Sequence, residues 1–194
     1  MIILSILFFV TALIYSSVGF GGGSTYLAIL LIWGVPYTIF PVIALVCNII
    51  VVSGNSINFI RSKNININLL FPYLIGSIPF AFIGGSITIE KSLFEILLFC
   101  ILLIAGIFLL IESKSFNKEQ IKINKIPRLI SISFGSIIGF MSGIVGIGGG
   151  IFLSPLLFLM KAGYPRHITS SASLFILINS IFGIAGQLTK DQVL

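Results

Sequence analysis

Charge is what this sequence most lacks. Only 8% of its 194 residues are charged, and the first charged residue after the amino terminus is Arg61. Soluble domains are about a quarter charged, and so few charges cannot cover a water-exposed surface. Further uncharged runs extend over residues 64–89, 96–111, 129–160 and 168–189. This scarcity excludes a soluble domain and predicts a multi-pass protein whose partner is the lipid bilayer of the cell membrane.

Cysteine, histidine and carboxylate groups are scarce as well. Cys47 and Cys100 lie inside apolar runs without metal-ligand spacing, and His167 is the single histidine. The expected spans contain no central carboxylate, metal cluster or acid–base pair, so we expect neither an enzyme nor a metal or cofactor site. The lack of a central carboxylate also argues against cation transport and favours an anionic or neutral substrate.

Basic residues gather in one polar stretch, residues 112–128. Five of its residues are lysine or arginine and two are glutamate. Arg61 and Lys63 precede it by two expected spans and therefore face the same side. Because cytoplasmic loops are enriched in lysine and arginine, the pattern predicts that this loop is cytoplasmic. The net charge of +6 is thus explained without a nucleic-acid partner.

The apolar runs divide into six expected spans and two shorter helices. A hydrocarbon core of about 30 Å takes roughly 20 helical residues. The expected spans cover residues 3–18, 37–60, 69–89, 93–111, 129–145 and 168–188. The two shorter helices, 25–33 and 152–160, are half as long as a crossing, and each follows a run of glycines. The fold class predicted is an all-α polytopic bundle containing two half-helices.

An internal repeat is predicted from two duplicated elements. The segment Gly19-Phe20-Gly21-Gly22-Gly23 recurs as Gly146-Ile147-Gly148-Gly149-Gly150, and Gly34-Val35-Pro36 recurs as Gly163-Tyr164-Pro165. We expect a first transmembrane repeat over residues 1–111, the basic loop over 112–128 and a second repeat over 129–194. The second copy is expected to be incomplete by roughly fifty residues, which would make the chain a fragment of a longer protein. Parallel and inverted copies both stay open, because the charge counts do not separate them.

The glycine runs are the main candidates for a binding site. Non-helical backbone at membrane depth is tolerated only where protein or a water-filled cavity satisfies its polar groups. A half-helix that starts after such a break directs free N–H groups and its positive dipole end at the cavity, which suits an anion. We expect Ser24 and Thr25 to cap the first half-helix. The alternative is that the glycines only let helix backbones approach one another.

The candidate substrate-binding residues are glycines, hydroxyl side chains and one amide. They are Gly21, Gly22, Gly23, Ser24, Thr25, Gly148, Gly149, Gly150, Thr169, Ser170, Ser171 and Asn179. The hydroxyl groups of residues 169–171 could equally cap or pack a helix. Other amides in or near the spans are Asn48, Asn55, Asn58 and Gln187. A helix-packing stripe is expected at Ser131, Gly135, Gly139 and Gly143.

The duplicated G-x-G-G-G and G-x-P elements resemble those of the TauE/SafE family, also called the sulfite exporter or toluene sulfonate uptake permease family. The resemblance covers about residues 10–60 and 135–188, and Thr169-Ser170-Ser171 looks like the family's threonine–serine element; Phe40-Pro41-Val42 departs from it in the first copy. It implies a transporter of sulfite, sulfonates or related organosulfur anions, coupled to an ion gradient, with the proton as the candidate coupling ion. A passive anion channel and a membrane structural or assembly protein are the alternatives. Substrate, direction and oligomeric state do not follow from these residues.

Overall fold

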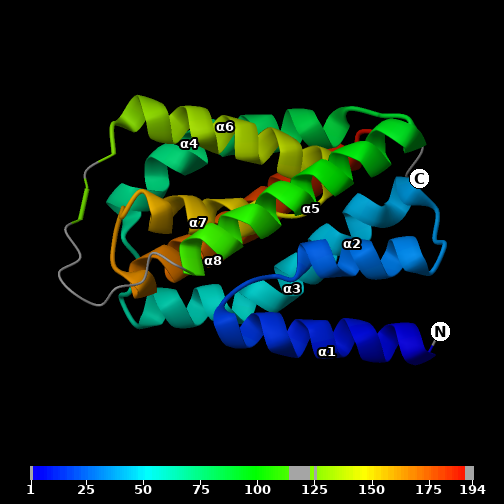
Figure 1. The fold of residues 1–194 in the computed structure, drawn as a ribbon, viewed down its shortest axis with the longest axis horizontal. Helices are drawn as coiled ribbons and strands as arrows, with labels where there is room; N and C mark the ends of the chain where they lie inside the picture. Colours follow the sequence, from blue (N-terminus) through cyan, green and yellow to red (C-terminus); the bar gives the residue numbers. More distant parts are fainter. Residues whose placement is uncertain (1, 114–122, 125, 191–194) are drawn as a thin grey trace.

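The computed structural model describes residues 2–113, 123–124 and 126–190, and this part of the chain consists of helices and the turns between them. The helices form one bundle (Figure 1). Their bounds are α1 Ile2–Val18, α2 Gly23–Ile32, the 3-10 helix η1 Tyr37–Ile39, α3 Phe40–Arg61, α4 Ile67–Ser86, α5 Lys91–Ser113, α6 Arg128–Val145, α7 Gly150–Leu159 and α8 Pro165–Gln187. Every helix expected from the sequence is therefore present.

Four of the described segments are long and apolar enough to cross a membrane. They are Tyr37–Arg61, Ile67–Ser86, Arg128–Val145 and Pro165–Gln187. The predicted all-α transmembrane fold is thereby confirmed. Some helix limits differ from the prediction. The half-helices begin two residues early, at Gly23 and Gly150, and α8 begins at Pro165, because proline suits the first helical position.

The two predicted half-helices run in opposite directions (Figure 1). Each has ten residues and starts in the middle of the bundle, immediately after a glycine segment. Helix α2 leads back toward the end of the bundle where the amino terminus lies, whereas α7 leads to the opposite end. The pairs α1–α2 and α6–α7 are thus hairpins that enter the bundle and turn back. If the two segments are copies of one repeat, their arrangement is the inverted one.

One end of the bundle collects basic residues, and we call it the basic end. Its contacts tie together segments distant in sequence, because Nδ1 of His167 lies 2.8 Å from the Asn64 carbonyl oxygen and the Asn124 N–H donates to the Lys161 carbonyl oxygen at 3.0 Å. The described cations there are Arg61, Lys63, Arg128, Lys161 and Arg166. Of the predicted basic loop, residues 114–122 and 125 lie outside the described residues. The opposite end holds Lys190, and we call it the Lys190 end.

The small-residue stripe predicted on α6 packs against α4. A Cβ atom on Gly139 would stand 2.5 Å from the Ser77 carbonyl oxygen, and one on Gly135 would stand 2.9 Å from the Tyr73 Cα atom. The two backbones are therefore in direct contact along this seam. Glycine is required there for close helix packing, as expected for a small-residue stripe.

Replacing Gly139 by valine is expected to lower the stability of the folded protein. The new side chain would overlap the Ser77 backbone, which no rotamer change can relieve, and overpacking of this kind costs about 1–3 kcal/mol or more. Gly106→Val is the matched control, because no atom lies within 4 Å of its Cβ position. Thermal unfolding in detergent should show a lower midpoint for Gly139→Val alone. Equal midpoints for the two variants would contradict the close contact of α4 and α6.

Candidate functional site

The amino-terminal ends of α2 and α7 meet inside the bundle. A Cβ atom on Gly23 would stand only 2.6 Å from the carbonyl oxygen of Ile147. Residues 21–24 and 144–150 are all buried. The two glycine segments are therefore in direct contact with one another.

Each half-helix starts from a glycine in the left-handed region of backbone space. The N-cap residues are Gly22, with φ of 81°, and Gly149, with φ of 78°, and no side chain caps either helix. The expected capping by Ser24 and Thr25 is therefore wrong. Both residues lie inside the first turn, and Thr25 Oγ1 instead pairs with the Tyr15 hydroxyl at 2.8 Å. Glycine adopts a positive φ without the steric cost that other residues incur, which explains why the N-cap is glycine and not serine.

The amino-terminal ends of α2 and α7 meet at one place, which we call the crossing. The first turn of each half-helix leaves backbone donors directed at the crossing. In both helices the N–H groups of the third and fourth residues donate to the carbonyl oxygen of the N-cap glycine, at 3.0–3.2 Å. The first two N–H groups have no acceptor one turn back, as at every helix start. Because two such ends converge here, their donors and dipoles add to a positive potential.

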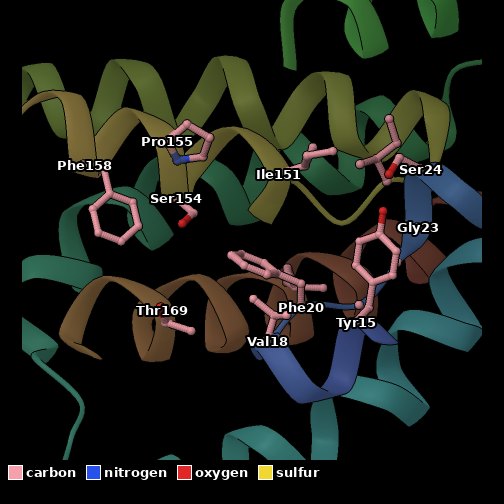
Figure 2. Close-up of a pocket in the computed structure, with 14 residues that line it drawn as sticks. Tyr15, Val18, Phe20, Gly23, Ser24, Ile151, Ser154, Pro155, Phe158 and Thr169 are labelled. Atoms are coloured by element: carbon pink, nitrogen blue, oxygen red, sulfur yellow. The ribbon is translucent and has the colours of Figure 1, made fainter. Parts of the chain in front are cut away.

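A cavity of about 380 Å³ lies against this crossing, and Figure 2 shows the side chains around it. Its polar side chains are Tyr15, Ser24, Ser154 and Thr169, and no charged side chain is among the described residues that line it. Apolar groups, including the Phe20 and Phe158 rings, form most of the remaining wall. From the glycine segments the cavity extends to Phe158 and Thr169, near the ends of α7 and α8 that reach the basic end.

The predicted site residues separate into three groups in the structure. Five of them line the cavity: Gly21, Gly22, Gly23, Ser24 and Thr169. Gly148, Gly149 and Gly150 lie outside the lining, and Gly148 and Gly150 pack against Ile176, whose side chain does line it. The remaining four, Thr25, Ser170, Ser171 and Asn179, are not lining residues either.

Two of these four make contacts that explain their position. Ser170 Oγ donates to the Asn64 carbonyl oxygen at 2.9 Å, so it fastens the turn between α3 and α4 at the basic end. Asn179 Nδ2 donates to the Phe175 carbonyl oxygen of its own helix at 2.9 Å. Ser171 is completely buried.

Asn48 on α3 joins the two glycine segments. Its Nδ2 donates to the Ile147 carbonyl oxygen at 3.0 Å and lies 2.7 Å from the Cβ position of Gly23. Its Oδ1 overlaps the Cβ position of Gly21 and has no hydrogen-bond partner in the described part of the chain. The only sequence signal for Asn48 is that it is one of three amides in an apolar run, where a polar residue is costly. Nothing in that run indicates which way the amide points.

Comparison with known proteins shows which family has similar sequences. The sequence model of the family described as sulfite exporter TauE/SafE matches residues 4–194. A probable membrane transporter protein of Sinorhizobium fredii is 30% identical over 185 residues, which cover 94% of this chain and 74% of that protein. A probable membrane transporter protein of Methanocaldococcus jannaschii is 32% identical over 206 residues, with 97% and 73% covered. No solved structure gives a significant match.

These matches agree with the resemblance carried by the duplicated glycine elements. They extend over both half-helices, the four spans and the cavity between them. Because the family's sequence model covers almost the whole chain, the protein belongs to the sulfite exporter TauE/SafE family and is a membrane transporter.

Proposed function

We propose that this protein moves small sulfur-containing oxyanions, namely sulfite, sulfonates or related organosulfur anions, and that the cavity at the crossing is the substrate site. The observation that carries the proposal is that the first turn of α2, at Gly23 and Ser24, and Ile151 in the first turn of α7 line one cavity. Helix N-termini bind oxyanions through free N–H groups and the dipole. Discontinuous helices of this kind commonly form the binding sites of secondary transporters.

The polar and apolar parts of the cavity suit the two parts of an organosulfur anion. Its oxygens would accept hydrogen bonds from the backbone at Gly23 and Ser24, assisted by the Ser154 and Thr169 hydroxyl groups. An apolar remainder would lie against Phe20 and Phe158. The absence of a carboxylate from the described lining residues means that no like charge opposes the anion there.

Flux measurements in proteoliposomes test this proposal. Labelled sulfite and a labelled small alkanesulfonate are supplied with and without an imposed proton gradient. We expect accumulation above the equilibrium level only when the gradient is present, because a coupled transporter can concentrate its substrate. Saturable flux that no gradient concentrates would favour the passive channel. No flux of either anion would overturn the proposed substrate class.

We also propose that residues 1–111 and 129–194 are two inverted copies of one transport unit. The support is the pair of ten-residue half-helices that follow glycines of nearly equal φ and run in opposite directions (Figure 1). Inverted repeats with binding sites at their interface are a recurrent transporter architecture.

The basic end is expected to face the cytoplasm of the cell. Its cations follow the distribution of lysine and arginine found on cytoplasmic loops. Cysteines are introduced singly as Arg61→Cys at the basic end and Lys91→Cys at the Lys190 end, after Cys47 and Cys100 are replaced by alanine. An impermeant thiol reagent added to intact cells should label only the cysteine at position 91. Labelling only at position 61 would show that the basic end faces the outside of the cell, contrary to this proposal.

A further inference from the structure

A second and much smaller cavity lies at the Lys190 end. Its volume is about 20 Å³, room for about one water molecule. Ile144 in the last turn of α6 lines it, whereas Ile147 lines the large cavity. Between them, a Cβ atom on Gly146 would stand 2.8 Å from the carbonyl oxygen of Pro41, which also lines the small cavity. The turn from α6 to α7 therefore separates the two cavities.

Lys190 borders the small cavity and is held by a neutral partner. Its Nζ donates to Gln187 Oε1 at 2.8 Å. The Gln187 side chain is completely buried, and its Nε2 donates to the Gly143 carbonyl oxygen at 2.8 Å, so the acceptor is fixed against α6. Among the described residues, no carboxylate pairs with Lys190. Lys91, which follows Ile89 of the cavity lining by two residues, differs, because its Nζ lies 3.8 Å from Glu95 Oε1.

The surroundings of Lys190 suit an anion. The Tyr37 and Thr38 side chains line the same cavity and carry hydroxyl donors. Burial lowers the pKa of Lys190, because desolvation disfavours the ammonium form. An anion beside the ammonium would offset that cost, which the neutral Gln187 amide does only in part.

We propose that Lys190, together with the Tyr37 and Thr38 hydroxyl groups, forms a second oxyanion-binding site on the far side of the α6–α7 turn. This inference rests on the proposed function, because the same anion would occupy the two sites in succession. In the conformation described, the site at the crossing has about 380 Å³ and the Lys190 site only about 20 Å³. The Lys190 site must therefore enlarge before it accepts the anion, and its ammonium is already in place.

Charge replacement at position 190 tests the inference. In the full chain with Cys47 and Cys100 replaced by alanine, Lys190→Cys removes the ammonium. Alkylation with bromoethylamine then restores an ammonium on a lysine-like side chain, and alkylation with iodoacetamide adds a neutral group of similar length. Lys91→Cys, treated in the same ways, is the control at the same end. The probe is labelled sulfite, supplied to right-side-out and inside-out vesicles.

The inference predicts an effect that depends on the face of the membrane. For entry from the Lys190 end, the half-saturating sulfite concentration should rise by about tenfold or more in Lys190→Cys, as for loss of a hydrogen bond to a charged group. This concentration should return to the parent value after aminoethylation but not after treatment with iodoacetamide. The half-saturating concentration for entry from the basic end should change little. A purely structural role would alter entry from both faces equally.

The outcomes separate this inference from the proposed function. If Lys190→Cys behaves like Lys91→Cys, or shifts both faces alike, the second site is overturned and the transporter assignment stands. If the parent protein carries neither sulfite nor a sulfonate from either face, the proposed function fails instead, and the second site fails with it.

Discussion

Ser24→Asp should abolish anion transport while leaving the protein folded. Ser24 lies in the first turn of α2, is 8% exposed and lines the large cavity. A carboxylate in a first turn is stabilised by the free N–H groups and the dipole, so the variant should still insert. It would also occupy the place proposed for the substrate. Two like charges about 4 Å apart repel by about 4 kcal/mol at an effective dielectric constant of about 20.

That repulsion corresponds to anion binding weakened by two to three orders of magnitude, and we expect labelled sulfite flux to fall by at least about a hundredfold. Ser24→Asn is the matched control, because it adds nearly the same volume without the charge. Its flux should stay within about tenfold of the parent, the effect of about 1.4 kcal/mol. If the glycines serve only for packing, the two variants should behave alike. Equal flux in Ser24→Asp and Ser24→Asn would therefore show that the substrate does not bind at the crossing.

Asn48→Leu should uncouple the two glycine segments and strongly reduce transport. The variant loses the donor that pairs with the Ile147 carbonyl oxygen at 3.0 Å, and that buried oxygen is left without a partner. An unpaired buried acceptor costs about 1–3 kcal/mol. Because Asn48 also contacts Gly21 and Gly23, its loss should change the geometry of the crossing itself. We expect flux per folded molecule to fall by about tenfold or more, the equivalent of about 1.4 kcal/mol.

Asn55→Leu is the control for Asn48→Leu, because it makes the same substitution on the same helix at a position away from the crossing. Asn55 is also on α3, and its Nδ2 donates to the Ser16 carbonyl oxygen at 2.9 Å, outside the crossing. Both variants should unfold at lower temperature, as measured by thermal unfolding in detergent. Only Asn48→Leu should lose flux after correction for the amount of folded protein. Equal flux in the two variants would show that the Asn48 contact is structural only.

The sequence was sufficient to predict the helices because the bilayer imposes a simple rule. Uncharged runs of about 20 residues must cross as helices, and the four described spans follow that rule. The half-helices were predictable for a similar reason, since glycine runs at membrane depth break a helix. The helix limits were less accurate where glycine and proline decide them. Gly23, Gly150 and Pro165 all start helices earlier than the hydropathy pattern indicates.

The site was predictable only in part, because it depends on how each helix is rotated about its axis. Asn48 and Asn179 are both buried amides in apolar helices, and the sequence analysis chose Asn179 as the candidate site residue. In the structure, Asn48 faces the opposite glycine segment, whereas the Asn179 amide bonds within its own helix. Ser154 lines the cavity because of how α7 is rotated about its axis, which points the Ser154 hydroxyl group toward α8 (Figure 2).

The position of the α6–α7 turn has a consequence for the response of the transporter to membrane voltage. If the large cavity fills with water from the basic end, that water carries the electrical potential of the basic-end solution as far as the glycine segments. In that case most of the voltage falls over the short remaining distance to the Lys190 end. A monovalent anion crossing the turn would experience most of the electrical work, about 2.3 kcal/mol per 100 mV, in one short step. The same anion would move between the basic end and the crossing almost independently of voltage.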